Sequence, residues 1–173
     1  MRLAVGSNRI INCVNNVNIS AAGSGIGGVL GKCYGTLEMI NCVNTGVISD
    51  IGKSKSVAGI IGRNEANTKI FNSYNLGDII SPGLQVGGII GYGVVEAIII
   101  NVYNAGNITV NGSRGRGGII GSFGGNVTIG TIKNAYNVGT IVDKKVNWTY
   151  GAGSMCGYFY NDNTKLTIEN GYY

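Results

Sequence analysis

One short asparagine-centred segment recurs along this chain at nearly constant intervals, and this repetition constrains the fold more than any other feature. The copies read INCVNN, INCVNT, FNSYNL, INVYNA and KNAYNV, and a last fragment reads ENGYY. Their first asparagines are spaced by 29, 31, 29, 33 and 36 residues, and they are Asn12, Asn41, Asn72, Asn101, Asn134 and Asn170. A period of roughly 20 to 50 residues is typical of solenoids and other arrays, so each interval is interpreted as one structural unit.

Two further apolar segments follow each asparagine segment. The first carries a lone isoleucine about two residues after a turn, at Ile19, Ile48, Ile79, Ile108 and Ile141. The second reads IGGVLG, VAGIIG, VGGIIG, RGGIIG and, in the last unit, AGSMCG. Segments this short, separated by turn residues, are too short for helices and typical of strands. We therefore predict an all-β fold: a parallel β-helix or solenoid of about five coils of roughly 30 residues, with three short strands in each.

The repeat extends over nearly the whole chain, so residues 1–173 are expected to form a single repeat domain. Its units lie near 10–38, 39–69, 70–98, 99–131 and 132–167. Neither end carries an obvious cap of the kind that a free-standing solenoid needs, so we expect a fragment of a longer array.

The second asparagine of each copy is predicted to build a ladder along one corner of the coils. Its amide can bond both the local backbone and the same residue of the next coil. The ladder would consist of Asn15, Asn44, Asn75, Asn104 and Asn137. The glycines two residues later are expected to take φ > 0, and they are Gly46, Gly77, Gly106 and Gly139. A neighbouring tyrosine column is interpreted as packing, with ligand binding as the alternative; it comprises Tyr74, Tyr103, Tyr136 and Tyr172.

The composition limits the available chemistry. The chain has no histidine, and only 12% of its residues are charged, with a net charge of +5. A zinc site would therefore need four thiolates together, from Cys13, Cys33, Cys42 and Cys156. Cys13 and Cys42 occupy one repeat position where serine and alanine stand later, so buried free thiols are favoured over a disulfide or a metal.

The sequence carries no segment that directs it to a membrane. No apolar run approaches the roughly 20 residues of a spanning helix, and we expect no membrane insertion. The first ten residues, MRLAVGSNRI, lack the apolar centre of a signal peptide. A cytosolic chain and a piece of a longer exported chain both remain open.

Catalysis on a solenoid would need carboxylates that converge on one face. The eight acidic residues instead fall on several positions of the repeat; they are Glu38, Asp50, Glu65, Asp78, Glu96, Asp143, Asp162 and Glu169. We predict a protein without catalytic residues, metal or cofactor, and the alternative is a carbohydrate-active β-helix enzyme, either a polysaccharide lyase or a hydrolase.

The glycine-rich AAGSGIGG lacks the Lys-Ser/Thr of a phosphate-binding loop and is interpreted as structural. Nucleic acid is not an expected partner, because the basic residues are few and no known module matches.

Two sets of side chains are candidate binding surfaces. A basic ridge lies in the loop between the predicted second and third strands, formed by Lys53, Lys55, Arg114, Arg116, Lys144 and Lys145. It would bind an anionic glycan or cell-wall polymer, or it would only keep the loop solvated. The second alternative is favoured, because Asp50 and Asp143 lie in the same loops. An aromatic set follows the third strand, formed by Tyr34, Tyr92, Phe123, Tyr158 and Tyr160. It would form a glycan platform if exposed, or would pack beneath the loops.

The combined pattern, INCVNTGVIS followed by VAGIIG and FNSYNLGDII followed by VGGIIG, resembles the GLUG repeat. That repeat occurs in large bacterial surface and secreted proteins, including immunoglobulin A peptidases and predicted adhesins. The last units depart from it, with Arg116 and Ala152 at the usual valine and Ser-Met-Cys in place of Gly-Ile-Ile.

The resemblance implies export, an extracellular or bacterial cell-surface location and no catalytic residues. On this basis we expect a non-catalytic extracellular repeat module that acts as a stiff spacer or adhesion scaffold. The candidate partners are a cell-wall polymer, a glycan or a host surface protein. The coil ends would also permit end-to-end self-association.

Overall fold

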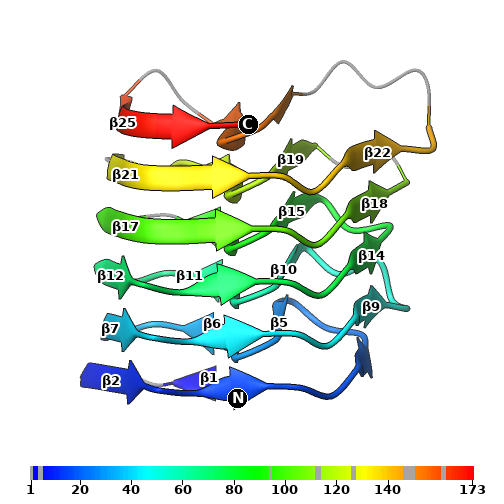
Figure 1. Cartoon of the computed structure of the whole chain (residues 1–173), viewed down its shortest axis with the longest axis horizontal. Coiled ribbons are helices and arrows are strands. Elements are labelled where there is room, and N and C mark those ends of the chain that lie inside the picture. The colour runs from blue at the N-terminus through cyan, green and yellow to red at the C-terminus, as the bar shows by residue number, and fades with distance from the viewer. Residues whose placement is uncertain are drawn as a thin grey trace.

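The computed structural model describes residues 2–3, 6–93, 95–111, 114–125, 128–145, 151–160 and 163–173, and every element within them is a β-strand. Each repeat unit turns once around a common axis, and successive units stack on one another (Figure 1). In each turn the chain passes through four sheets, which we call B, C, D and A in that order. None of the described residues belongs to a helix long and apolar enough to span a membrane.

Sheets B and C contain the asparagine segments and the lone isoleucines. The longer strands of sheet B are β2 (Ser7–Ile11), β7 (Thr36–Ile40), β12 (Thr68–Phe71), β17 (Ala97–Asn104), β21 (Thr128–Asn137) and β25 (Thr164–Tyr172). Its short strands are β3 (Val14–Asn15), β8 (Val43–Asn44) and β13 (Tyr74–Asn75). Sheet C consists of β4 (Ile19–Ala21), β9 (Ile48–Asp50), β14 (Ile79–Ser81), β18 (Ile108–Val110) and β22 (Ile141–Asp143).

Sheets D and A contain the glycine-rich segments. Sheet D consists of β5 (Ile26–Gly27), β10 (Ser56–Ala58), β15 (Gln85–Gly87), β19 (Gly115–Gly117) and β23 (Ala152–Gly153). Sheet A consists of β1 (Arg2–Leu3), β6 (Leu30–Cys33), β11 (Ile61–Asn64), β16 (Ile90–Gly93), β20 (Ile120–Phe123) and β24 (Cys156–Phe159).

All strand pairings are parallel, and equivalent repeat positions pair with each other. Ile48, for example, pairs with Ile19 below and Ile79 above. The predicted parallel solenoid is confirmed. The predicted third strand is divided, however, because the chain bends between Ala58 and Ile61, so each coil contributes to four sheets.

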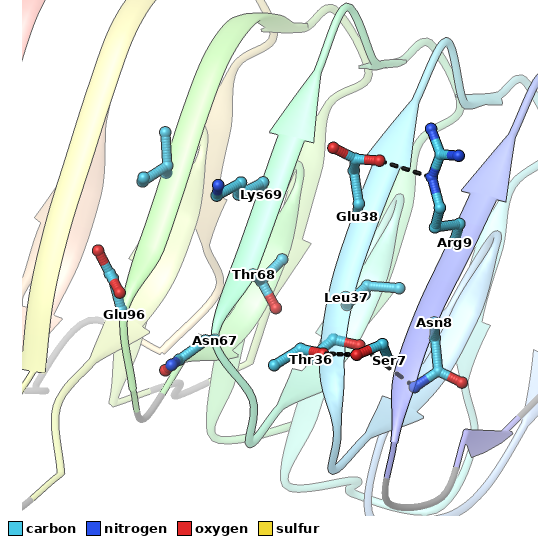
Figure 2. A pocket seen from close by; sticks show the side chains of 11 residues that line it. Ser7, Asn8, Arg9, Thr36, Leu37, Glu38, Asn67, Thr68, Lys69 and Glu96 are labelled. Carbon is cyan, nitrogen blue, oxygen red and sulfur yellow. Dashed lines mark hydrogen bonds and ion pairs between the residues drawn. The ribbon is translucent and has the colours of Figure 1, made fainter.

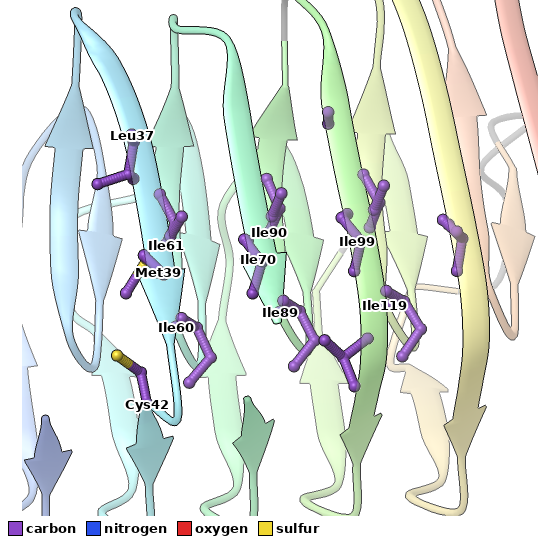
Figure 3. Packing of buried hydrophobic residues seen from close by; sticks show 14 of the residues in the cluster. Leu37, Met39, Cys42, Ile60, Ile61, Ile70, Ile89, Ile90, Ile99 and Ile119 are labelled. Atoms are coloured by element: carbon purple, nitrogen blue, oxygen red, sulfur yellow. The ribbon is translucent and has the colours of Figure 1, made fainter. Parts of the chain in front are cut away.

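The apolar core has two parts. The larger part lies between sheets A and B and includes Leu37, Met39 and Ile70 (Figure 3). The smaller part lies between sheets C and D, where Ile48 and Ile79 are fully buried. Burying one isoleucine side chain contributes about 1.5 to 3 kcal/mol, and each of these residues is covered by the coils above and below. The core is therefore a property of the stack rather than of one coil.

The predicted asparagine ladder is present at the corner where sheet B passes into sheet C. The Asn44 amide donates to Gly46 O at 2.8 Å and to Asn75 Oδ1 at 2.7 Å. The same two bonds recur at every step, and the complete row is Asn15, Asn44, Asn75, Asn104 and Asn137. We call this row the inner ladder. Its middle members have no exposed surface, so the amides must satisfy one another.

The bend between sheets D and A packs directly on the inner ladder. A Cβ placed on Gly59 would lie 2.2 Å from the Asn75 Cγ, and one on Gly88 would lie 2.5 Å from the Asn104 side chain. A side chain larger than hydrogen has no room there. The second glycine of VGGIIG is thus explained by contact with the ladder, which lies between the two parts of the core.

The expected positive φ at the glycines after the ladder is wrong. Among the described residues, Gly6 and Gly124 are the glycines with positive φ. Gly77 is required for a different reason, since a Cβ on it would lie 2.0 Å from Gly46 O of the preceding coil. The left-handed conformation belongs instead to the first asparagine of each copy, as at Asn41 with φ 55°.

These first asparagines form a second row on the outside of sheet B, which we call the outer ladder. Asn41 Nδ2 donates to Asn12 Oδ1 at 3.0 Å, and Asn101 donates to Asn72 in the same way. The outer amides donate toward the N-terminal coil, whereas the inner amides donate toward the C-terminal coil. The outer ladder is exposed to solvent, so its bonds compete with water.

The two ladders are predicted to differ in their effect on stability. Asn75→Ala removes two donated bonds and one accepted bond from a buried site, so we expect the free energy of unfolding to fall by about 3 kcal/mol. Asn72→Gly is the matched control, because glycine tolerates the φ of 50° at that exposed position. Urea unfolding of both variants checks this, and equal losses would contradict the account.

The contact between glycine and the inner ladder gives a second prediction. Gly59→Ala should lower the free energy of unfolding by more than about 3 kcal/mol or abolish folding, because the new methyl group overlaps Asn75. Gly23→Ala should change it by less than about 0.5 kcal/mol, since a Cβ there meets nothing within 4 Å. Circular dichroism during urea titration measures both, and a tolerated Gly59→Ala would show that the bend does not press on the ladder.

Candidate binding surfaces

A groove lies on the outer face of sheet B, across the strands β2, β7, β12 and β17. Its volume is about 350 Å³, which lies within the range of small-ligand sites. Figure 2 shows two rows of side chains along it, one containing Thr36 and Asn67 and the other containing Glu38 and Lys69. We call it the sheet B groove.

The sequence interpretation missed the sheet B groove. Its rows consist of the residues five and three positions before the first asparagine of successive copies. Reading polar residues by repeat position, rather than by motif, would have found them. The depth of the groove depends on how small and large side chains alternate across neighbouring coils, which becomes visible only when the strand register is known.

The structure places five of the six ridge residues at the exposed corner between sheets C and D. The loops at this corner follow the strands of sheet C (Figure 1). We call these residues the basic corner: Lys53, Lys55, Arg114, Lys144 and Lys145. Gln85 N donates to Lys55 O, and Arg114 N donates to Leu84 O, so Lys55 and Arg114 lie on either side of one coil.

Arg116 lies apart from the basic corner. Its side chain is 12% exposed, and its Nη1 lies 3.1 Å from Asp143 Oδ2. Arg116 stands in register with Val86, an inward position, so its guanidinium is directed into the coil. Arginine thus replaces the usual valine at position 116, and Asp143 on the facing sheet C binds its charge.

Asp50 is also turned inward, where it organises a loop. Its Oδ2 accepts from Ser54 N at 2.8 Å and from the Ser81 hydroxyl at 2.9 Å. Its Oδ1 accepts from Gly52 N and from the Ser54 hydroxyl. The carboxylates of Asp50 and Asp143 are therefore directed into the solenoid, whereas the five basic side chains of the same corner are exposed.

Three members of the aromatic set gather where the outer faces of sheets A and D meet. Tyr160 contacts Tyr92 and Tyr158 edge to face, with ring centroids 5.5 and 5.2 Å apart. The Tyr160 hydroxyl accepts from buried Gln85 Nε2 at 2.7 Å, and the Tyr92 hydroxyl donates to Gly124 O at 2.8 Å. These bonds fix the rings between the two sheets, so the cluster packs the interface rather than offering open ring faces.

The other two aromatic residues do not join this cluster. Phe123 is fully buried in the core between sheets A and B, which removes it from any exposed platform. Phe123 occupies the same position of its strand as Cys33 and Asn64, which are also buried. This equivalence becomes visible only when the strand register is known. Tyr34 lies beside Lys32, whose ammonium is 4.5 Å from the ring centroid.

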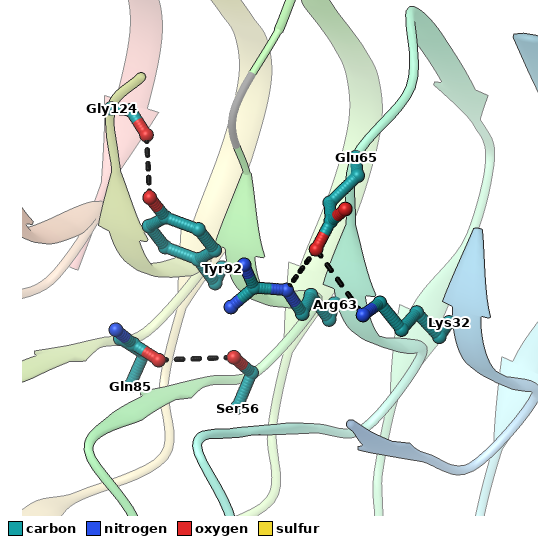
Figure 4. Close-up of polar contacts among 7 residues, drawn as sticks. All are labelled: Lys32, Ser56, Arg63, Glu65, Gln85, Tyr92 and Gly124. Atoms are coloured by element: carbon teal, nitrogen blue, oxygen red, sulfur yellow. Dashed lines mark hydrogen bonds and ion pairs between the residues drawn. The ribbon is translucent and has the colours of Figure 1, made fainter. Parts of the chain in front are cut away.

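A polar network continues from the aromatic cluster along sheet A. The Arg63 guanidinium lies 4.7 Å from the Tyr92 ring centroid and binds Glu65, which Lys32 also contacts at 3.3 Å (Figure 4). Burial tends to raise the pKa of Glu65, but the hydrogen bond and charge of Arg63, together with Lys32, hold that pKa below its ordinary value. This network ties three coils together.

The tyrosine column is a stack of rings along sheet B. Tyr74 and Tyr103 are 4.6 Å apart at an interplanar angle of 7°, and Tyr103 and Tyr136 are 4.7 Å apart at 3°. Tyr103 has a ring stacked on each of its faces, so neither face is available to a ligand. The packing interpretation fits this geometry.

The described carboxylates are mostly engaged in structural contacts. Asp50, Glu65 and Asp143 are bound as described above, and Asp78 Oδ1 accepts from Asn107 N. Glu38 pairs with Arg9, and Glu169 pairs with Lys133. Within the described ranges there is no cluster of three metal-ligating side chains. Asp162 lies outside the described residues.

The four cysteines are free thiols with different environments. Cys33 and Cys42 are buried as expected, but Cys13 is exposed, because its coil has no neighbour on one side among the described residues. Burial raises the pKa of the Cys33 and Cys42 thiols, and raises the pKa of Cys156 to about 12.

Thiol labelling should therefore select one site. At pH 8, below the raised pKa values, the three less exposed thiols remain protonated and covered, so we expect maleimide to modify Cys13 first. Peptide mass spectrometry after short exposure measures this, and Cys13→Ser should remove the rapid reaction. Equal early labelling of Cys42 would show that the second coil opens readily.

Comparison with known proteins gives no further identification. No family model, no curated protein and no solved structure matches the chain.

Proposed function

We propose that this chain is a non-catalytic repeat module of the GLUG kind, located outside a bacterial cell, where it acts as a stiff spacer or adhesion scaffold. The observation that carries the proposal is the inner ladder, whose side-chain bonds link consecutive coils from Asn15 to Asn137. A row of buried hydrogen bonds along the axis, parallel to the backbone ladders, resists bending and sliding between coils. Such a stack suits a load-bearing or distance-setting role.

The exterior location rests on the resemblance of INCVNTGVIS and VAGIIG to the GLUG repeat. If the protein is exported, protease added to intact cells of the encoding bacterium should cleave it. Protection until the cells are lysed would place it inside and remove this part of the proposal.

The enzyme alternative receives less support. The sheet B groove contains two carboxylates. Glu38 lies on strand β7, and Glu96 lies directly before strand β17. They lie two coils apart, about 10 Å along the stack, which is at or beyond the separation used by glycosidases. Glu38 is moreover held by Arg9 at 2.7 Å. No observation favours a reaction at this groove.

Adhesion to an anionic polymer is assigned to the basic corner. Its five cations project from one corner of the stack, while Asp50 and Asp143 in the same loops are directed inward. A linear polyanion lying along the axis would meet cations from several coils at once, and each exposed contact is screened by salt. Binding is therefore expected at low ionic strength and should weaken as salt is added.

The corresponding test removes four charges from the corner. Substituting Lys53, Lys55, Lys144 and Lys145 by glutamine should lower the salt concentration at which the protein elutes from a dextran sulfate column. The matched control substitutes four cations of sheet B by glutamine: Arg9, Lys69, Lys133 and Lys165. Both variants lower the net charge by four, from +5 to +1. Equal elution of the two variants would mean that only net charge matters.

A further inference from the structure

The sheet B groove combines several hydrogen-bonding side chains with an apolar patch and balanced charge. Its first row is Ser7, Thr36, Asn67 and Glu96, and its second row is Arg9, Glu38, Lys69 and Ile98. Equivalent residues of successive coils repeat at about 4.8 Å, the spacing of hydrogen-bonded strands. The groove therefore presents polar groups periodically along the solenoid axis.

Two charged groups in the groove have no partner among the described residues. Glu38 is paired with Arg9 at 2.7 Å, but neither the Lys69 ammonium nor the Glu96 carboxylate makes a hydrogen bond or ion pair with any described side chain. Both residues are exposed. The groove thus offers one free strong donor and one free strong acceptor on adjacent coils.

The charge of the groove distinguishes it from the basic corner. Arg9 and Lys69 are balanced by Glu38 and Glu96, so the formal charge of the lining is zero. A polyanion gains no net attraction there. Thr36 and Asn67 add neutral hydrogen-bonding groups, and Ile98 adds an apolar contact.

We propose that the sheet B groove binds a neutral, linear saccharide whose chain runs along the solenoid axis. Sugar hydroxyl groups both donate and accept, so neighbouring hydroxyls satisfy Glu96 and Lys69 together. A pyranose ring in an extended β-linked chain is about as long as the 4.8 Å coil spacing, so successive rings meet successive coils. The C–H faces of the rings pack on Ile98 and on the alkyl stem of Lys69.

An extended peptide fits the groove less well. Peptides that join a sheet need a free strand edge. Strands β7 and β12, which form the centre of the groove, are already paired on both sides. The ligand must therefore bind through side chains alone, which favours a hydroxyl-rich chain. This inference does not depend on the spacer function, and either can fail without the other.

The test titrates the complete chain with cellohexaose and, separately, with chitohexaose, followed by ¹H–¹⁵N NMR. We expect one of these neutral probes to shift the amide signals of β7 and β12 at about 1 mM or below. No shift with either probe at that concentration would overturn the proposal. A shift confined to the basic corner would overturn it as well.

Substitution then locates the site. Lys69→Ala combined with Glu96→Ala leaves the net charge unchanged and alters exposed side chains, and we expect at least about tenfold weaker saccharide binding. The matched control, Lys133→Ala combined with Glu169→Ala, also leaves the net charge unchanged, alters an exposed ion pair outside the groove lining and should bind as the unmodified chain does. Circular dichroism and urea unfolding verify that both variants are folded. Unchanged affinity in the Lys69/Glu96 variant would show that the saccharide binds elsewhere.

Discussion

The stacking of each coil on the next is the constraint on which the rest of this structure depends. Parallel strands lie about 4.8 Å apart, so every inward position must tolerate its own equivalent directly above and below. Isoleucine meets this condition by apolar contact, as at Ile48 and Ile79. Asparagine meets it at the polar corner, because one amide donates to the next and each buried group is satisfied.

The solenoid fold and the inner ladder could be predicted from sequence, because the repeat shows which residues of successive coils occupy equivalent positions. Recurrence of Asn44 and Asn75 at one position was enough to predict the inner ladder. The role of Gly77 was misassigned, since its cause is the close approach of Gly46 O from another coil rather than local backbone conformation. The interior placement of Arg116 also could not be predicted, because its partner Asp143 lies on the facing sheet.

Residues on the outer faces of the sheets do not have to pack on their equivalents in the neighbouring coils, and the candidate binding surfaces lie on these outer faces. Apart from the outer ladder and the tyrosine column, outward rows need only avoid clashes, so their residues differ from coil to coil. The sequence identified the cations of the basic corner but not that Asp50 is directed away from them. It missed the sheet B groove, because a hollow depends on relative side-chain size across coils. It also left open whether Phe123 is exposed or packed, and the structure places that ring in the core.

The most direct test of coil stacking is small-angle X-ray scattering of a chain that lacks residues 72–100. This deletion removes one 29-residue unit and joins Phe71 to Asn101, so every row keeps its register. The account predicts a folded solenoid with an unchanged coil cross-section that is shorter by about 4.8 Å along the stacking axis. An expanded, unfolded scattering profile or an altered cross-section would contradict it.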